Sequence, residues 1–308
     1  MQKLLTVLVC LFAAVSVSMA AGTTSGEFLK IGAGARAAGM GDVFAGVSDD
    51  SSAIYWNPSG LNQIENMCGS LMHSMWIEGI SYNWISFVYP MSGKGVIGGG
   101  LTSVSYGSLI ETDETGLEIG TFSPADIAVT VSYAWVISDI PVGASLKIIS
   151  SQIKESSQGF GLDIGGMYEM EDYGLTLGGA IQNLGGSMKY VSETDPLPMN
   201  IKLGASYIIE ENWIAAGDLN VPSGSDFSLG FGTEYRYKLN TGMIICGRAG
   251  YNMKTKDISG MQGMSLGFGL DQKGYSFDYS YSPYGDLGAV QKISLSAKFG
   301  GETSMFIR

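Results

Sequence analysis

Charged side chains are scarce in this sequence. They make up 15% of the 308 residues, whereas a soluble globular domain normally carries roughly 25%. Much of the folded surface is therefore expected to meet a solvent other than water. Long apolar runs are also missing, because past the N-terminus no stretch approaches the roughly 18 apolar residues that a spanning helix requires. The composition disfavours both a soluble globular domain and a helical membrane protein.

Cysteine is nearly absent, with 3 in the chain. Cys10 lies near the N-terminus, while Cys68 and Cys246 are too few for a disulfide-stapled fold and match no metal-ligand spacing. One disulfide between them stays open but is not indicated. Basic residues are few as well, since 17 Lys and Arg stand against 29 Asp and Glu. This scattered positive charge argues against nucleic-acid binding, which requires clustered Lys and Arg. We expect no metal and no cofactor.

The first twenty residues have the pattern of a secretory signal peptide. Lys3 supplies a short positive region, residues 4–17 are apolar, and Ser18-Met19-Ala20 is a small-x-small cleavage site. The apolar run is too short for an anchor helix. We therefore expect export of the chain and cleavage after Ala20, and we exclude residues 1–20 from the fold.

Apolar side chains then recur at every second position, which is the period of a β-strand. In residues 226–238 one face carries Phe227, Phe231 and Tyr235, and the other is mostly Gly and Ser with an occasional charge. A soluble β-sandwich alternates too, but its polar face meets water and is normally rich in Lys, Glu and Thr. Small residues suit the interior of a barrel instead, where they leave room for a plug or a lumen.

We predict an all-β fold, a transmembrane antiparallel barrel of about fourteen strands with a small N-terminal hatch. The predicted strands are residues 69–78, 82–91, 95–107, 126–137, 140–153, 159–170, 173–186, 198–209, 212–222, 226–238, 241–254, 264–273, 275–285 and 288–300.

The lengths of the connections support a barrel independently. Those after even-numbered segments are very short, for example Ser138-Asp139, whereas the long ones, 108–125, 185–197 and 253–263, all follow odd-numbered segments. The first hairpin, at Gly79-Ile80, is a short exception. Outer-membrane barrels combine short periplasmic turns with longer external loops. The pattern therefore predicts which end of the barrel faces outward.

The segment before the strands has a different composition. Residues 26–67 are dense in small residues and fit no strand. Small residues allow close backbone packing, so we divide the mature chain into a hatch at 21–67, a barrel at 68–300 and a tail at 301–308. A disordered periplasmic lead-in is the alternative for the hatch. Candidate hatch or ligand-gating residues are Arg36, Asp42, Asp49, Asp50, Asn57, Pro58 and Gly60.

Charged residues on the inward face of the predicted strands form a second candidate set. Such charges must find partners or water inside the barrel. The residues expected to face the lumen are Asp163, Lys202, Glu234, Arg236, Asp271 and Asp278.

Three motifs suggest chemistry but lack the necessary context. Residues 32–37 match the G-x-G-x-x-A dinucleotide fingerprint, yet that motif needs a preceding strand and a βαβ unit. His73, the single histidine, neighbours Ser74, but successive strand residues point to opposite faces, which separates a Ser-His pair. The acidic group Glu111, Asp113, Glu114 and Glu118 matches no calcium-loop spacing and is expected to be a solvated external loop.

The residues of the hatch carry a family resemblance. The stretch from Phe28 to Asp42, continuing through Asp49-Asp50 to Asn57-Pro58 and Gly60-Leu61, resembles the N-terminus of PorV/PorQ-type proteins in the FadL-like group of outer-membrane transporters. Residues 279–281 and 288–296 extend the resemblance. It implies a fourteen-stranded barrel with an N-terminal hatch that contains the Asn57-Pro58 stretch. Residues 300–308 depart from this group by following the aromatic Phe299, so that Phe306 becomes the candidate terminal aromatic.

The resemblance implies type IX secretion or hydrophobic-compound uptake. We therefore expect a non-enzymatic outer-membrane barrel that binds partners, either secreted cargo or other secretion components, in protein secretion or surface attachment. The alternative is a FadL-like transporter of a hydrophobic small molecule, and a third class is a purely structural membrane protein. The sequence does not separate these functions, because the same hatch and loops serve all three.

Overall fold

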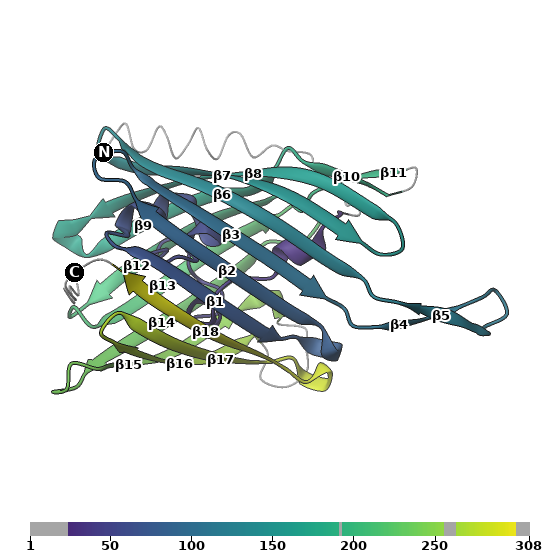
Figure 1. The fold of residues 1–308 in the computed structure, drawn as a ribbon. Helices are drawn as coiled ribbons and strands as arrows, with labels where there is room; N and C mark the ends of the chain where they lie inside the picture. The colour runs from purple at the N-terminus through teal and green to yellow at the C-terminus, as the bar shows by residue number, and fades with distance from the viewer. Residues whose placement is uncertain (1–23, 191–192, 256–262, 300–308) are drawn as a thin grey trace.

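The computed structural model describes residues 24–190, 193–255 and 263–299. Within these ranges the chain forms a closed barrel of 14 antiparallel strands, which confirms the predicted fold (Figure 1). Strands next to each other in the barrel follow one another along the chain, and β1 pairs with β18 to close the ring. The expected signal peptide and the tail, including Phe306, lie outside the described residues.

Each predicted segment corresponds to one barrel strand, with ends that differ by a few residues. The barrel strands are β1 (Met67–Met75), β2 (Ser81–Pro90), β3 (Val96–Ser105), β6 (Ala125–Ile137), β7 (Ile140–Gln152), β8 (Ser156–Met170), β9 (Leu175–Leu184), β12 (Asn200–Ile209), β13 (Trp213–Pro222), β14 (Ser228–Lys238), β15 (Ile244–Asn252), β16 (Met264–Gln272), β17 (Tyr275–Pro283) and β18 (Ala289–Phe299).

Alternation along the strands sorts side chains between lipid and interior. On β14, Phe231 is 59% exposed and Tyr235 46%, whereas Ser228 and Glu234 point inward and are buried. The outward aromatic and aliphatic side chains meet the membrane, which solvates them without cost. The period of two in the sequence thus predicts the facing of this strand correctly.

Connections at the two ends of the barrel differ as the sequence predicts. The turns at one end are 91–95, 138–139, 171–174, 210–212, 239–243 and 273–274. At the opposite end, connections 106–124 and 185–199 are much longer. We assign the short-turn end to the periplasm and the other end to the exterior, following the general architecture of outer-membrane barrels.

The connections 106–124 and 185–199 contain structure that the sequence does not reveal, and most of the third predicted long connection, 253–263, lies outside the described residues. The first folds into a hairpin of β4 (Leu109–Thr112) and β5 (Glu118–Phe122), and the second into a hairpin of β10 (Ser187–Tyr190) and β11 (Glu193–Pro196). Figure 1 shows β4 and β5 extending well beyond the barrel. These segments were expected to be loops, and their strands are too short to show a clear alternation.

The hatch lies inside the ring of strands (Figure 1). Short helices make up much of it, and further single turns join the strands. The helical elements are η1 (Glu27–Lys30), α2 (Ala35–Gly39), α3 (Ala53–Trp56), η2 (Pro58–Gln63), η3 (Ile77–Gly79), η4 (Glu171–Tyr173), η5 (Met253–Thr255) and η6 (Gly285–Leu287). In the described ranges, no helix has both the length and the apolar character needed to cross a membrane.

The hatch traverses the barrel from the external end to the periplasmic end. At the start, the Ser25 backbone N–H donates to the carbonyl of Pro196, beside the second hairpin, at 2.9 Å. Near its end, the Asn62 side-chain amide donates to the Trp135 carbonyl at 3.2 Å, close to turn 138–139. The chain then enters β1. This course leaves no part of residues 25–64 as a lead-in outside the barrel.

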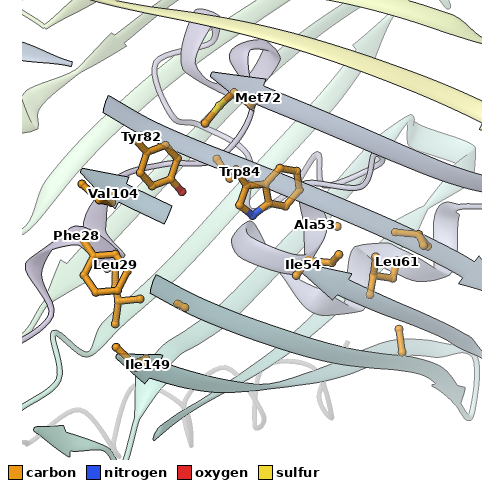
Figure 2. Close-up of a cluster of buried hydrophobic side chains, with 14 of the residues drawn as sticks. Phe28, Leu29, Ala53, Ile54, Leu61, Met72, Tyr82, Trp84, Val104 and Ile149 are labelled. Carbon is orange, nitrogen blue, oxygen red and sulfur yellow. The ribbon is translucent and has the colours of Figure 1, made fainter. Parts of the chain in front are cut away.

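Apolar side chains fix one side of the hatch to the wall. Figure 2 shows Phe28, Leu29 and Ile54 of the hatch beside the inward-facing Tyr82 and Trp84 of β2. All five are buried, with exposed fractions of 6% or less. The inside of this barrel is therefore a packed core on this side, and burial of apolar area stabilises the hatch there.

Candidate functional site: the hatch, its ion cluster and an external chamber

A cluster of charged groups joins the hatch to the opposite wall. The guanidinium of Arg36, on α2, contacts the carboxylates of Asp49 and Asp50 in the hatch, the latter at 3.0 Å. Its Nε also donates to Glu234 Oε2 on β14 at 2.8 Å, and its Nη2 donates to Oε1 at 3.0 Å. The bidentate geometry fixes both position and orientation. Arg36 thus links two parts of the hatch to the barrel.

Glu234 is the centre of this cluster. Its side chain is fully buried and contacts Arg36, Arg236 on the same strand at 2.7 Å, and Arg248 on β15. Arg248 in turn donates to Asp278 on β17 at 2.7 Å. The network satisfies a carboxylate that would otherwise be costly to bury.

Electrostatic pairing outweighs burial for two of the hatch residues in this cluster, Arg36 and Asp49. Burial by itself lowers the pKa of Arg36, but Asp49, Glu234 and Asp50 raise that pKa well above its ordinary value. Burial likewise raises the pKa of Asp49, yet Arg36 and then Arg236 hold it below its ordinary value. Both groups therefore keep their charge at neutral pH, and the hatch stays ion-paired to the wall.

The predicted Asn57-Pro58 turn anchors the hatch to the other wall. Asn57 is fully buried; its Oδ1 accepts from the backbone N–H of Ser59 at 3.2 Å, and its Nδ2 donates to the Ala45 carbonyl at 3.0 Å. A further bond runs from Nδ2 to the carbonyl of Gly166 on β8 at 3.3 Å. Pro58 opens η2, where proline at the first helical position is favoured.

Two other hatch candidates have distinct surroundings. Gly60 packs so closely that a Cβ added there would lie 2.1 Å from the Ser48 carbonyl oxygen, so its role is close backbone approach. Asp42 adopts a left-handed backbone, with φ of 61°. It faces a chamber and takes no part in the ion cluster.

This chamber lies on the external side of the hatch, with a volume of about 430 Å³. Its floor includes Asp42, Tyr55 and Trp56 of the hatch. The remaining lining comes from η1, from β9 and β12 to β15, and from the neighbouring connections. The side chains on these surfaces are Glu27, Leu29, Lys30, Gln182, Asn183, Pro198, Asn200, Lys202, Asn220, Pro222, Ser225, Asp226, Phe227, Ser228, Asn252, Met253 and Lys254.

The predicted lumenal charges fall into separate groups. Glu234, Arg236 and Asp278 belong to the ion cluster, and Lys202 lines the chamber, 3.9 Å from Asp218. Asp163 is buried beside the ammonium of Lys147, at 2.8 Å, where a register shift interrupts the pairing of β8 with β9.

Asp271, the last of the predicted lumenal charges, accepts from Ser276 at 2.9 Å, away from the ion cluster and the chamber. Other residues at these two sites were not singled out from the sequence. Arg248 and Asp218 were missed, although both occupy inward positions of predicted strands, so the alternation would have found them. Trp56, which carries Lys202 over its ring at 4.8 Å, gave no comparable signal.

The catalytic motifs considered above form no reactive group. His73 is exposed and pairs with Asn83 at 2.8 Å, whereas Ser74 is buried on the opposite face. Residues 32–37 lead into the short helix α2 within the lumen. The described residues contain no group of three or more His, Cys, Asp or Glu side chains that would hold a metal ion.

A single strand offers a test of how tightly the hatch fits. We expect Gly250→Val on β15 to displace the hatch, because a Cβ there would lie 2.1 Å from the backbone nitrogen of Gly41, and overpacking of this kind costs about 1–3 kcal/mol or more. Gly247→Val is the matched control, since a Cβ there meets nothing within 4 Å. Limited proteolysis of the folded barrel measures hatch displacement. Equal protease resistance in both variants would contradict the tight fit.

Comparison with known proteins supplies the family context. A family model described as "Type IX secretion system protein PorV" matches residues 16–221, and a search of curated proteins found no match. Among solved structures, the Ralstonia pickettii toluene transporter TbuX is similar with a TM-score of 0.59 and 15% identity, covering 87% of this chain and 99% of that chain.

Two further structures have the same kind of similarity. The Pseudomonas putida toluene transporter TodX gives a TM-score of 0.56 at 12% identity, covering 87% of this chain and 96% of that chain. A Pseudomonas aeruginosa FadL homologue gives 0.56 at 13%, covering 85% and 97%. At such low identity these structures show the fold alone. The barrel and the family indicate the outer membrane, and neither the PorV family nor the FadL-like transporters are enzymes.

Proposed function

This chain belongs to the PorV family, and from that premise we propose that its external hairpins bind a protein partner in type IX-like secretion or surface attachment. The partner is a secreted cargo protein or another component of the secretion machinery. The barrel holds the hairpins at the cell surface, since loops on a rigid scaffold commonly carry recognition.

The hairpin of β4 and β5 is the observation that carries this proposal. It extends past the membrane-spanning strands, yet it exposes large apolar side chains: Ile110 is 59% exposed, Leu117 66% and Ile119 58%. Exposed apolar groups in water mark interaction sites. A two-stranded ribbon also presents backbone donors and acceptors at its edges, to which a partner strand can add.

The closed interior supports a scaffold role for the barrel. The hatch is ion-paired to β14 through Arg36 and Glu234, and on the other side Asn57 donates to the backbone of β8. A lumen packed from both sides serves as a rigid support and does not need to open for partner capture.

Deletion of a hairpin tests this function directly. We expect removal of residues 109–122, or of 187–196, to abolish crosslinking of the partner in intact cells, with the crosslinked protein identified by mass spectrometry. The control is Asn57→Ala, which alters the hatch and is expected to leave crosslinking unchanged. Heat-dependent migration on gels verifies that every variant is folded. Undiminished crosslinking of the same protein in both deletions would refute the proposal.

Transport of a small molecule is the second candidate function, and the chamber of about 430 Å³ favours it. The similar structures TbuX and TodX are toluene transporters by title. In this case Asn57→Ala or Pro58→Ala should change uptake of a hydrophobic compound, while deletion of residues 109–122, which lie apart from the hatch, should leave uptake unchanged. Loss of uptake in the hatch variants with normal crosslinking would rank transport first.

A further inference from the structure

The chamber carries opposite charges on facing surfaces. Asp42 contributes a carboxylate from the hatch, while Lys254 contributes an ammonium from η5 and Lys202 another from β12. In the described structure, neither ammonium lies within ion-pair distance, 4.0 Å, of the Asp42 carboxylate. The positive and negative groups line the same space and therefore do not neutralise each other by direct contact.

Two acceptors at this chamber lack a donor. Oδ1 of Asp42 and Oδ1 of Asn200 are buried, and neither has a hydrogen-bond partner in the part of the chain that the structure describes. An unsatisfied buried acceptor costs about 1–3 kcal/mol, and more when it is charged. A ligand that brings N–H donors would remove this cost.

Lys254 has unused donors within the part of the chain that the structure describes. An ammonium carries three N–H donors, and among the described residues that of Lys254 makes one hydrogen bond, to the Lys30 carbonyl at 3.3 Å. The side chain of Lys254 is exposed, so a ligand in the chamber can reach its ammonium. A ligand carboxylate at this position would supply the missing counter-charge.

We propose that the chamber binds a small zwitterion of the amino-acid or short-peptide type, with its ammonium at Asp42 and its carboxylate at Lys254 and Lys202. Amide groups from Gln182 and Asn200 line the space between and suit a peptide backbone. The volume of about 430 Å³ lies in the range of roughly 300–1,000 Å³ that small-molecule sites occupy.

This chemistry differs from that of a hydrocarbon site. A purely apolar ligand would strip water from Asp42, Lys202 and Lys254 and return no hydrogen bonds, which is costly for charged groups. The apolar surfaces of Trp56 and Phe227 are available to the side chains of a peptide. The proposal is independent of partner binding by the hairpins, because the chamber lies among other elements.

Calorimetric titration of the full chain in detergent tests the proposal with three probes: alanyl-alanine, its N-acetyl form and its C-terminal amide. We expect saturable binding of alanyl-alanine and at least about tenfold weaker binding of each capped form, a factor that corresponds to about 1.4 kcal/mol. Equal affinity for capped and uncapped probes, or no saturable binding of alanyl-alanine up to roughly 10 mM, would overturn it.

Matched variants assign each charge to its end of the ligand. Asp42→Asn should weaken the binding of alanyl-alanine about tenfold but leave the binding of the N-acetyl form unchanged. Lys254→Met should likewise weaken the binding of alanyl-alanine but leave the binding of the C-terminal amide unchanged. Asp271→Asn is the control, because this inward carboxylate lies outside the chamber and accepts a hydrogen bond from Ser276. The Asp271→Asn variant should bind alanyl-alanine with the affinity of the wild type. If Asp42→Asn weakens both the free and the N-acetyl probe equally, the assigned orientation is wrong.

Discussion

Glu234→Ala is expected to lower the free energy of unfolding by about 3–5 kcal/mol, the usual cost of removing one partner from a buried ionic network. The variant leaves Arg36, Arg236 and Arg248 close together, without the carboxylate that all three contact. Asp49, Asp50 and Asp278 remain but reach only part of this positive charge. Desolvated like charges then repel across the join between hatch and wall.

Urea unfolding in detergent, followed by intrinsic fluorescence, measures this loss. Glu169→Ala is the control, since Glu169 is an exposed carboxylate on β8, a barrel strand away from the ion cluster, and a surface change of this kind normally stays within about 0.5 kcal/mol. Adding Arg248→Met to Glu234→Ala should recover part of the stability by removing one unpaired cation. A loss no larger than that of Glu169→Ala would show that the cluster does not hold the hatch.

Phe268→Arg is expected to destabilise the barrel by about 2–4 kcal/mol if the side chain lies near the middle of the membrane. Phe268 is 41% exposed on the outer face of β16, so an arginine there would place its charge in lipid. Leu229→Arg on β14 should behave similarly. Ser228→Arg, one residue away, should cost less because Ser228 lines the chamber and the new side chain has room and water there.

Unfolding free energies in lipid vesicles compare the two faces directly. The contrast between Leu229→Arg and Ser228→Arg is the informative one, because the residues are adjacent and differ in facing. Equal costs for these two variants would mean that the in-and-out assignment of β14 is wrong or that its outer face does not meet lipid.

The barrel was predictable because the alternation of side chains along each strand is a local feature of the sequence. A strand that separates lipid from a packed interior must alternate, and the short turns of this chain mark where each strand ends. The hairpin β4–β5 escaped prediction because its four- and five-residue strands are largely exposed on both faces, where neither position is forced to be apolar. The hairpin β10–β11 escaped prediction because its strands are only four residues long, so that one buried side chain, Met188, does not make a recognisable alternation.

The ion cluster was only partly predictable, for a different reason. Alternation places Glu234 and Arg248 inside the barrel, and composition marks Arg36 as a rare charge among small residues. Their contact, however, joins positions that are 198 residues apart in the case of Arg36 and Glu234. That pairing depends on how the hatch is seated, which no periodicity encodes. The chamber could not be predicted from the sequence for the same reason, since its walls come from segments that are far apart along the chain.

The course of the hatch makes its mechanical resistance depend on direction. Its external end is held at Ser25 by hydrogen bonds to the second hairpin, whereas its periplasmic end continues covalently into β1 at Met67. When the hatch is pulled toward the cell interior, only non-covalent contacts such as the Arg36 ion pairs resist the force. When the hatch is pulled toward the outside, its covalent link to β1 also resists the force. The hatch is therefore expected to be displaced toward the periplasm by a smaller force than toward the exterior.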